Sequence, residues 1–136
     1  MTIEEPQRAT LIARIQHDLD AKAEIAFAYL HGSVVSGDAY RDIDVAVWLD
    51  ESHVPREKWT RYALDLSVAL HLKLRYVVDV RVLNDSALSF RYHALQGQLL
   101  VVRDREFLDE MRARVWDEYF DFLPFARRYL REALSE

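Results

Sequence analysis

The chain has 136 residues, half of them apolar, and contains no cysteine. This length suffices for one domain with two packed layers, so we expect residues 1–136 to form a single domain. Without cysteine, disulfides and thiolate metal sites are excluded, and with no secretory signal or membrane-spanning run we expect a cytoplasmic protein. The net charge of −5 is spread along the chain without a basic block, which disfavours a long nucleic-acid substrate.

Helical and extended patterns alternate along the first half of the chain. Apolar residues at helical spacing predict a helix over roughly residues 5 to 20. An aromatic and aliphatic run then predicts a strand from about Glu24 to Leu30. The next strand is predicted from Asp42 to Leu49, where every second side chain is aliphatic and should point to one face of a sheet.

The second half continues this alternation. Its predicted elements are, in order, a helix from about Pro55 to His71, a strand from Arg75 to Leu83, a short helix to about Leu95 that Asn84 or Asp85 caps, a strand from Gln98 to Val102, and a long helical segment from about Asp104. Pro124 is expected to kink or interrupt that segment, because proline removes an amide donor and clashes with the preceding turn. Together the elements predict an α/β or α+β fold, in which helices flank a mixed sheet of about four strands.

Asp42 and Asp44 are the first candidate site residues. They lie two residues apart in one strand, so both carboxylates should leave the same side of the sheet. Like charges held this close repel unless a cation neutralises them, and Mg²⁺ is usually bound by one or two carboxylates together with substrate phosphates. The alternative is that this end of the strand is exposed and both side chains lie in water.

Asp79 is the third candidate. It lies inside an apolar strand, where a buried carboxylate without a partner would be costly. If this strand lies beside that of Asp42, three carboxylates converge, and two metal ions could bridge them to a triphosphate. The alternative is an ion pair with Arg81, two residues away on the same face, or with Arg75.

Gly32 and Ser33 follow the first predicted strand. A junction of this kind can direct free amides, and the Ser33 hydroxyl, toward an anion such as a phosphate. Taken alone, a Gly-Ser pair is more often an ordinary turn. The five histidines lack the paired spacing of a zinc-binding helix, so no zinc site is predicted, and most of them are expected to be surface or packing residues.

A family resemblance rests on the segment from His31 to Val47, HGSVVSGDAYRDIDVAV. This segment resembles the Gly-Ser…Asp-x-Asp signature of the polymerase-beta-like nucleotidyltransferases, and most closely that of the minimal nucleotidyltransferases (MNT) that act as antitoxins to HEPN-domain toxins. The likeness extends through Asp79 and the segments 97–104 and 117–124. The loop before Asp42 is shorter than is usual in the family, and Ser36 stands where the family often has a basic residue.

The resemblance implies an enzyme that transfers AMP from ATP to a tyrosine hydroxyl of a partner HEPN RNase toxin and so neutralises it. It implies that Asp42, Asp44 and Asp79 are catalytic and bind two Mg²⁺ ions, and that Gly32 and Ser33 bind the nucleotide together with Asp42 and Asp44. The Arg-x-x-x-x-His motif of such toxins does not occur in this chain, so the toxin would be a separate protein in a hetero-oligomer. No direct contact with nucleic acid or membrane is expected.

Two alternative functions remain open. One is nucleotide transfer to a small hydroxyl compound such as an aminoglycoside, although such enzymes usually add a domain that shapes the acceptor pocket. The other is a catalytically weak antitoxin that acts by binding alone. The aromatic residues near the C-terminus are first of all expected to be core, but they are spread too widely for one helix face, so part of the set is predicted to be an interface: Trp116, Tyr119, Phe120, Phe122, Phe125 and Tyr129.

Overall fold

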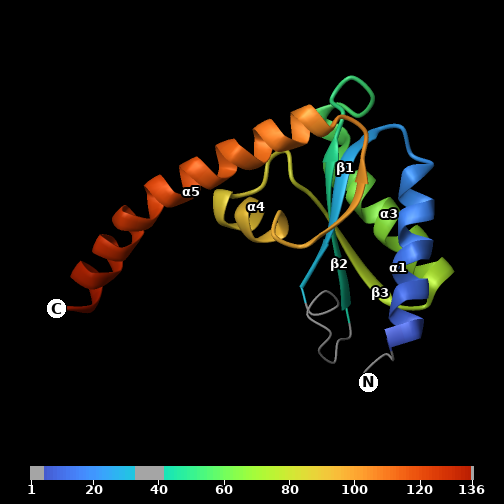
Figure 1. The fold of residues 1–136 in the computed structure, drawn as a ribbon, viewed down its shortest axis with the longest axis horizontal. Coiled ribbons are helices and arrows are strands. Elements are labelled where there is room, and N and C mark those ends of the chain that lie inside the picture. The colour runs from blue at the N-terminus through green and yellow to red at the C-terminus, as the bar shows by residue number, and fades with distance from the viewer. Residues whose placement is uncertain (1–4, 33–41, 136) are drawn as a thin grey trace.

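The structure is a computed structural model that describes residues 5–32 and 42–135. The elements of these residues follow the predicted alternation of helices and strands (Figure 1). In chain order they are α1 (Glu5–Asp20), β1 (Ile25–His31), β2 (Asp42–Leu49), the short 3₁₀ helix η1 (Arg56–Lys58), α3 (Trp59–Leu74), β3 (Val77–Val82), α4 (Leu88–Ala94), β4 (Gln98–Val102) and α5 (Arg105–Leu134).

The four strands form one mixed sheet in the order β3-β2-β1-β4. β1 is antiparallel to both β2 and β4, whereas β2 and β3 are parallel. Parallel neighbours need a crossover connection, and α3 supplies it. The predicted α+β fold with a mixed four-stranded sheet is therefore confirmed.

Helices cover both faces of the sheet, which gives two apolar clusters (Figure 1). On β2, the aliphatic residues Ile43, Val45 and Val47 are fully buried in the cluster that α1 and α3 complete. Ala46 and Trp48 belong to the opposite cluster, under α4 and the first part of α5. The two-residue alternation predicted for this strand is confirmed, and it places Asp42 and Asp44 on the α4 side.

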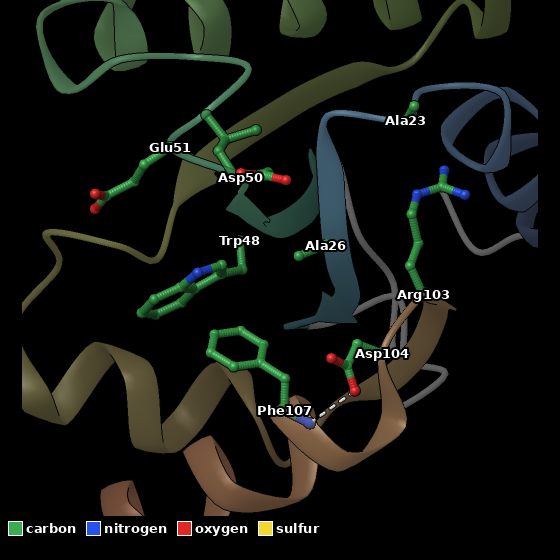
Figure 2. A pocket seen from close by; sticks show the side chains of 9 residues that line it. Ala23, Ala26, Trp48, Asp50, Glu51, Arg103, Asp104 and Phe107 are labelled. Atoms are coloured by element: carbon green, nitrogen blue, oxygen red, sulfur yellow. Dashed lines mark hydrogen bonds between the residues drawn. The ribbon is translucent and has the colours of Figure 1, made fainter.

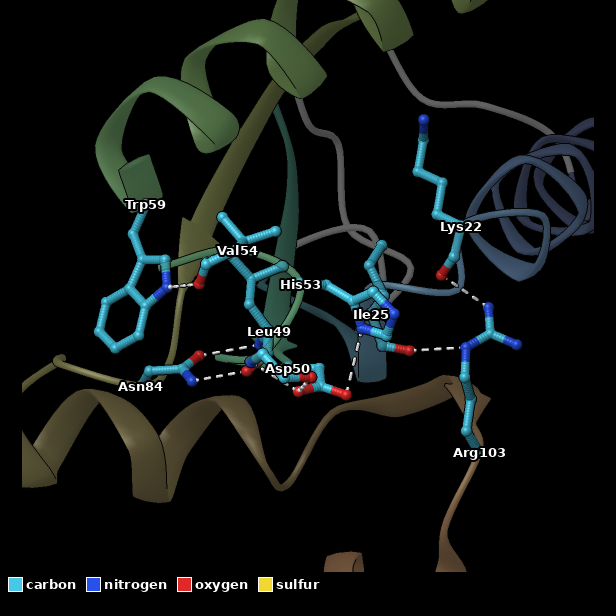
Figure 3. Close-up of polar contacts among 10 residues, drawn as sticks. Lys22, Ile25, Leu49, Asp50, His53, Val54, Trp59, Asn84 and Arg103 are labelled. Carbon is cyan, nitrogen blue, oxygen red and sulfur yellow. Dashed lines mark hydrogen bonds and ion pairs between the residues drawn. The ribbon is translucent and has the colours of Figure 1, made fainter. Parts of the chain in front are cut away.

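The connection from β3 to α4 differs from the prediction. The side-chain oxygen of Asn84 accepts from the Leu49 amide at 2.9 Å, and its amide nitrogen donates to the Leu49 carbonyl at 2.8 Å (Figure 3). Asn84 thus imitates a strand neighbour at the end of β2 and does not cap α4. The helix begins at Leu88, after an extended Ala87 that makes no side-chain cap, so the predicted cap at Asn84 or Asp85 is wrong.

Arg103, directly after β4, fixes the connection between α1 and β1. Its guanidinium donates to the carbonyl oxygens of Ile25 at 2.8 Å and Lys22 at 2.8 Å (Figure 3), and to that of Asp20 at 2.7 Å. Five donors in a fixed fork suit such a cluster of backbone acceptors. The arrangement ties the N-terminal helix to the edge strand β4.

The last helix, α5, runs without interruption from Arg105 to Leu134, and Pro124 lies inside it. The Asp104 side chain caps its first turn by accepting from the Phe107 amide at 3.1 Å. Pro124 therefore does not interrupt the helix, which follows a curved path away from the sheet (Figure 1). None of the helices in the described ranges is long and apolar enough to cross a membrane.

Candidate active site

The sheet brings the predicted acidic residues side by side. In the register of the strands, Asp44 stands opposite His31 of β1 on one side and opposite Asp79 of β3 on the other. Neighbouring strands are about 4.8 Å apart, and paired residues share a face, so these side chains leave the sheet together. Asp42 lies two residues before Asp44 on the same face, at the exposed start of β2. The condition set for Asp79, that its strand lies beside that of Asp42, is therefore met.

Gly32 forms one wall of the site. Its φ of +81° is in the left-handed region, which glycine adopts without strain. A Cβ atom at this position would lie 2.5 Å from Oδ2 of Asp44. The backbone of Gly32 thus approaches the Asp44 carboxylate so closely that a side chain here would displace the carboxylate and strain the backbone. Its sequence neighbour Ser33, the other half of the predicted phosphate contact, lies outside the described residues.

Asp44 is partly buried, and its charge is disfavoured. Burial raises the pKa of the Asp44 carboxyl, and the nearby Asp79 and Asp42 carboxylates raise it further, while His31 and Arg81 oppose the rise. A carboxylate in such surroundings is stabilised by any cation that reaches it. The carboxylate oxygens of Asp42, Asp44 and Asp79 therefore suit a divalent cation that prefers oxygen ligands.

The surroundings of Asp79 correct part of the prediction. Its side chain is 47% exposed, so it is not a buried carboxylate that needs a cation for that reason. β3 is an edge strand with a single neighbour in the sheet, which leaves this position open. Arg81 donates from Nε to Oδ2 of Asp79 at 3.3 Å, so the alternative ion pair does form. An exposed pair of this kind contributes about 0–1 kcal/mol and gives way readily to a better cation.

Whether all three carboxylates converge on shared ions stays a prediction. Among the residues that the structure describes, no three histidine or acidic side chains form a group that could hold a metal ion. A closed protein cage is not required for Mg²⁺, which usually keeps several waters and takes substrate phosphates as further ligands.

His31 is a site residue that the sequence prediction missed. The ring is partly buried beside Asp44, and its Nε2 atom has no hydrogen-bond partner among the described residues. Burial lowers the pKa of His31 below its ordinary value, although the Asp44 carboxylate opposes this, so the imidazole is neutral at neutral pH. The edge of the ring meets Phe90 of α4 at a centroid distance of 5.4 Å. The sequence signal that could have identified His31 as a site residue is its position directly before Gly32.

α4 packs beside the site, on the same face of the sheet as the acids. The Phe90 ring also lies under the Arg81 guanidinium, at 5.2 Å from the ring centroid. Arg91, the next residue, donates to the carbonyls of Leu83 at 3.0 Å and Asn84 at 2.6 Å, which anchors the helix to the end of β3. Phe90 is therefore a fixed apolar contact for both His31 and Arg81.

A separate pocket of about 450 Å³ lies at the other end of β2 (Figure 2). Trp48 and Phe107 stand against each other in it, with ring centroids 5.8 Å apart. Asp50, Glu51 and Asp104 are among its polar lining residues. Trp48 is four residues from Asp44, about 13 Å along an extended strand, and none of the predicted site residues lines this pocket.

Comparison with known proteins identifies the family. The family model described as "Polymerase beta, Nucleotidyltransferase" matches residues 13–106, which is 94 of the 136 residues and includes all the site residues above. The chain belongs to this nucleotidyltransferase family. A search of curated proteins found no significant match.

Solved structures share the whole nucleotidyltransferase fold of this chain. A chain in the complex of a tri-AMPylated Shewanella oneidensis HEPN toxin with its MNT antitoxin is 17% identical, with a TM-score of 0.69 over 95% of this chain and 99% of that chain. A chain of the toxin–antitoxin pair MntA-HepT is 15% identical, with a TM-score of 0.64 over 97% and 100%. A chain of a toxin–antitoxin structure with AMP-PNP is 18% identical, with a TM-score of 0.61 over 98% and 100%.

Proposed function

We propose that this chain is an antitoxin that transfers AMP from ATP to a tyrosine hydroxyl of a separate HEPN-family RNase toxin and thereby neutralises it. One observation carries the proposal: Asp44 stands beside Asp79 in the register of two parallel strands, on the face that Asp42 shares. The family is that of nucleotidyltransferases, and the similar solved structures are described as toxin–antitoxin pairs, one of them with an AMPylated toxin and one with AMP-PNP.

In this proposal, Asp42 and Asp44 hold Mg²⁺, and Asp79 completes the ligand set after release from Arg81. The raised pKa of Asp44 supports this role, because a carboxylate destabilised by burial and by Asp79 and Asp42 gains most from a cation. When bound, Mg²⁺ would make the tyrosine hydroxyl more acidic and neutralise charge on the departing pyrophosphate. Gly32 and Ser33 contact the triphosphate, as the motif implies.

The proposed transfer forms a bond between the tyrosine oxygen and the α-phosphorus of ATP and breaks the bond from that phosphorus to the oxygen shared with the β-phosphate. Pyrophosphate leaves with the electron pair of that bond. The proton of the hydroxyl passes to a carboxylate of the site. Asp79 is suited to accept it, because its side chain is half-exposed and its ion pair with Arg81 is weak.

The test uses the purified chain and the purified HEPN-family toxin proposed as its partner, incubated with ATP and Mg²⁺. We expect the mass of the HEPN protein to rise by one or more AMP units, with release of an equal amount of pyrophosphate. A Glu57→Gln variant, changed in η1 of the opposite layer, is the control that should transfer normally. Neutralisation of the toxin without any change in its mass would instead establish an antitoxin that acts by binding alone.

Transfer to a small hydroxyl compound is less well supported. The 450 Å³ pocket of the described residues lies at the far end of β2, away from the three aspartates. An acceptor for this site must therefore be held by some other surface of the chain.

A further inference from the structure

The second half of α5 carries apolar side chains that the body of the molecule does not cover. Tyr119 stacks on Tyr92 of α4, with ring centroids 3.8 Å apart, and Phe120 meets the same ring edge-on at 6.1 Å. Phe120 and Phe122 are each 49% exposed, and the exposed fraction rises further along the helix, to 68% for Phe125 and 72% for Tyr129. Part of the aromatic set therefore lies on the surface of the chain, and its role as an interface stays a prediction.

These exposed residues form one stripe, which we name the arm face. It surrounds a surface hollow of about 470 Å³ and consists of Phe122, Phe125, Ala126, Tyr129 and Leu130. Their spacing of three, four, seven and eight residues places them on one side of a helix. Pro124 is two residues from both Phe122 and Ala126, which is about 200° around the helix, so the proline lies on the opposite side.

The shape of the arm face suits another helix. Residues at positions i, i+3, i+4 and i+7 form the hole into which one side chain of a facing helix inserts, and Phe122, Phe125, Ala126 and Tyr129 have this spacing. The apolar side chains of this part of α5 are largely exposed, so tertiary packing adds little to its stability, and an internal proline weakens it further. Packing against a second helix would stabilise it.

Two observations favour the acceptor protein over a second copy of this chain. The Shewanella toxin–antitoxin match leaves only 5% of this chain unaligned, about seven residues, whereas residues 117–134 number eighteen. Residues 117–134 therefore belong largely to the fold that this chain shares with a chain from such a complex. In addition, α4 lies between the second half of α5 and the strands (Figure 1). Its Phe90 contacts His31 beside the acids, and its Tyr92 stacks on Tyr119 of α5.

We infer that the arm face docks a helix of the HEPN partner and so holds the acceptor protein beside the acidic site. This inference rests on the proposed function, because it takes the protein that accepts AMP as the occupant. The arm face would then supply a surface for the acceptor, because the 450 Å³ pocket of the described residues lies away from the acidic end of the sheet.

The experiment measures affinity for the purified HEPN-family protein proposed as the partner. Phe125→Glu combined with Tyr129→Glu should weaken binding about 100-fold, because central interface aromatics often dominate the binding energy. Arg131→Glu is the matched control. It lies two residues from Tyr129, hence on the other side of the helix, and should bind normally. Melting temperatures of all variants, and of the milder Phe125→Ser, verify that any loss is not due to unfolding.

The outcomes separate docking from chemistry. Unchanged binding or an unchanged AMP transfer rate in the folded double variant would overturn the docking inference while leaving the proposed function intact. A wild-type chain that is dimeric by light scattering, and that the double substitution makes monomeric without loss of partner binding, would assign the arm face to a second copy and overturn it as well. Binding that depends on the arm face without any AMP transfer by the wild type would support docking and refute the proposed function.

Discussion

Replacing Asp44 by asparagine should abolish transfer and at the same time stabilise the chain. The carboxylate is partly buried against Gly32, and its pKa is raised by burial and by the carboxylates of Asp79 and Asp42. Removing a charge about 5 Å from another, at an effective dielectric constant of about 60 for this open site, relieves about 1 kcal/mol. For 136 residues this corresponds to a rise in Tm of about 4 °C.

The assay for Asp44→Asn combines thermal melting in chelator with the transfer reaction in Mg²⁺. Asp65→Asn is the control, because Asp65 is an exposed carboxylate that pairs with Arg61 on α3, at 3.0 Å and away from the site. We expect Asp65→Asn to retain transfer and to gain no stability. A folded Asp44→Asn variant with full transfer activity would refute the assigned role of Asp44. A Tm below that of the wild type in chelator would refute the electrostatic reasoning.

Three further predictions follow from individual contacts. Gly32→Ala should abolish transfer at a cost of about 1–2 kcal/mol in stability, because its Cβ would meet Oδ2 of Asp44 at 2.5 Å and its φ is left-handed. The comparison variant is Gly97→Ala, whose Cβ would lie 2.1 Å from the Leu30 carbonyl oxygen and which should mainly lower Tm. ATP should raise Tm only with Mg²⁺, since the carboxylates otherwise repel the triphosphate; an equal shift in chelator would place the nucleotide elsewhere. Burial is the largest single influence on Glu24 and acts to raise its pKa, but the hydrogen bond from Tyr62, a backbone hydrogen bond and the charges of Lys22 and His53 together outweigh it, so the pKa falls below the ordinary 4.5. The resulting stabilisation is present above pH 4.5 and is lost as the pH falls through the lowered pKa. Tyr62→Phe should therefore cost about 1 kcal/mol at pH 7 and progressively less in acid, as chemical denaturation at several pH values would show.

The sequence predicted those features that depend on local pattern. Alternation along Asp42–Leu49 was enough to place Asp42 and Asp44 on one face, and the bounds of β2 and β4 are those expected. The sequence argument for Asp79 depended on its strand lying beside that of Asp42. The two strands are indeed parallel neighbours, which a helix between two strands allows.

The features that the sequence did not reveal depend on contacts between distant segments. Asn84 is of a residue type that often caps helices, but its side chain makes hydrogen bonds to Leu49, 35 residues earlier in the chain. The exposure of Asp79 follows from the edge position of β3, and strand order cannot be obtained from alternation. His31 became recognisable as a site residue only when its register with Asp44 was known.

The central claim is that Asp42, Asp44 and Asp79 direct transfer of AMP onto a separate HEPN protein. Co-expression of this chain with the HEPN-family protein proposed as its partner, followed by intact-mass measurement and peptide mapping of the latter, tests it most directly. The account predicts one or more AMP units on a tyrosine with the wild-type chain and none with Asp44→Asn. An unmodified HEPN protein recovered with the wild-type chain, or equal modification with Asp44→Asn, would contradict it.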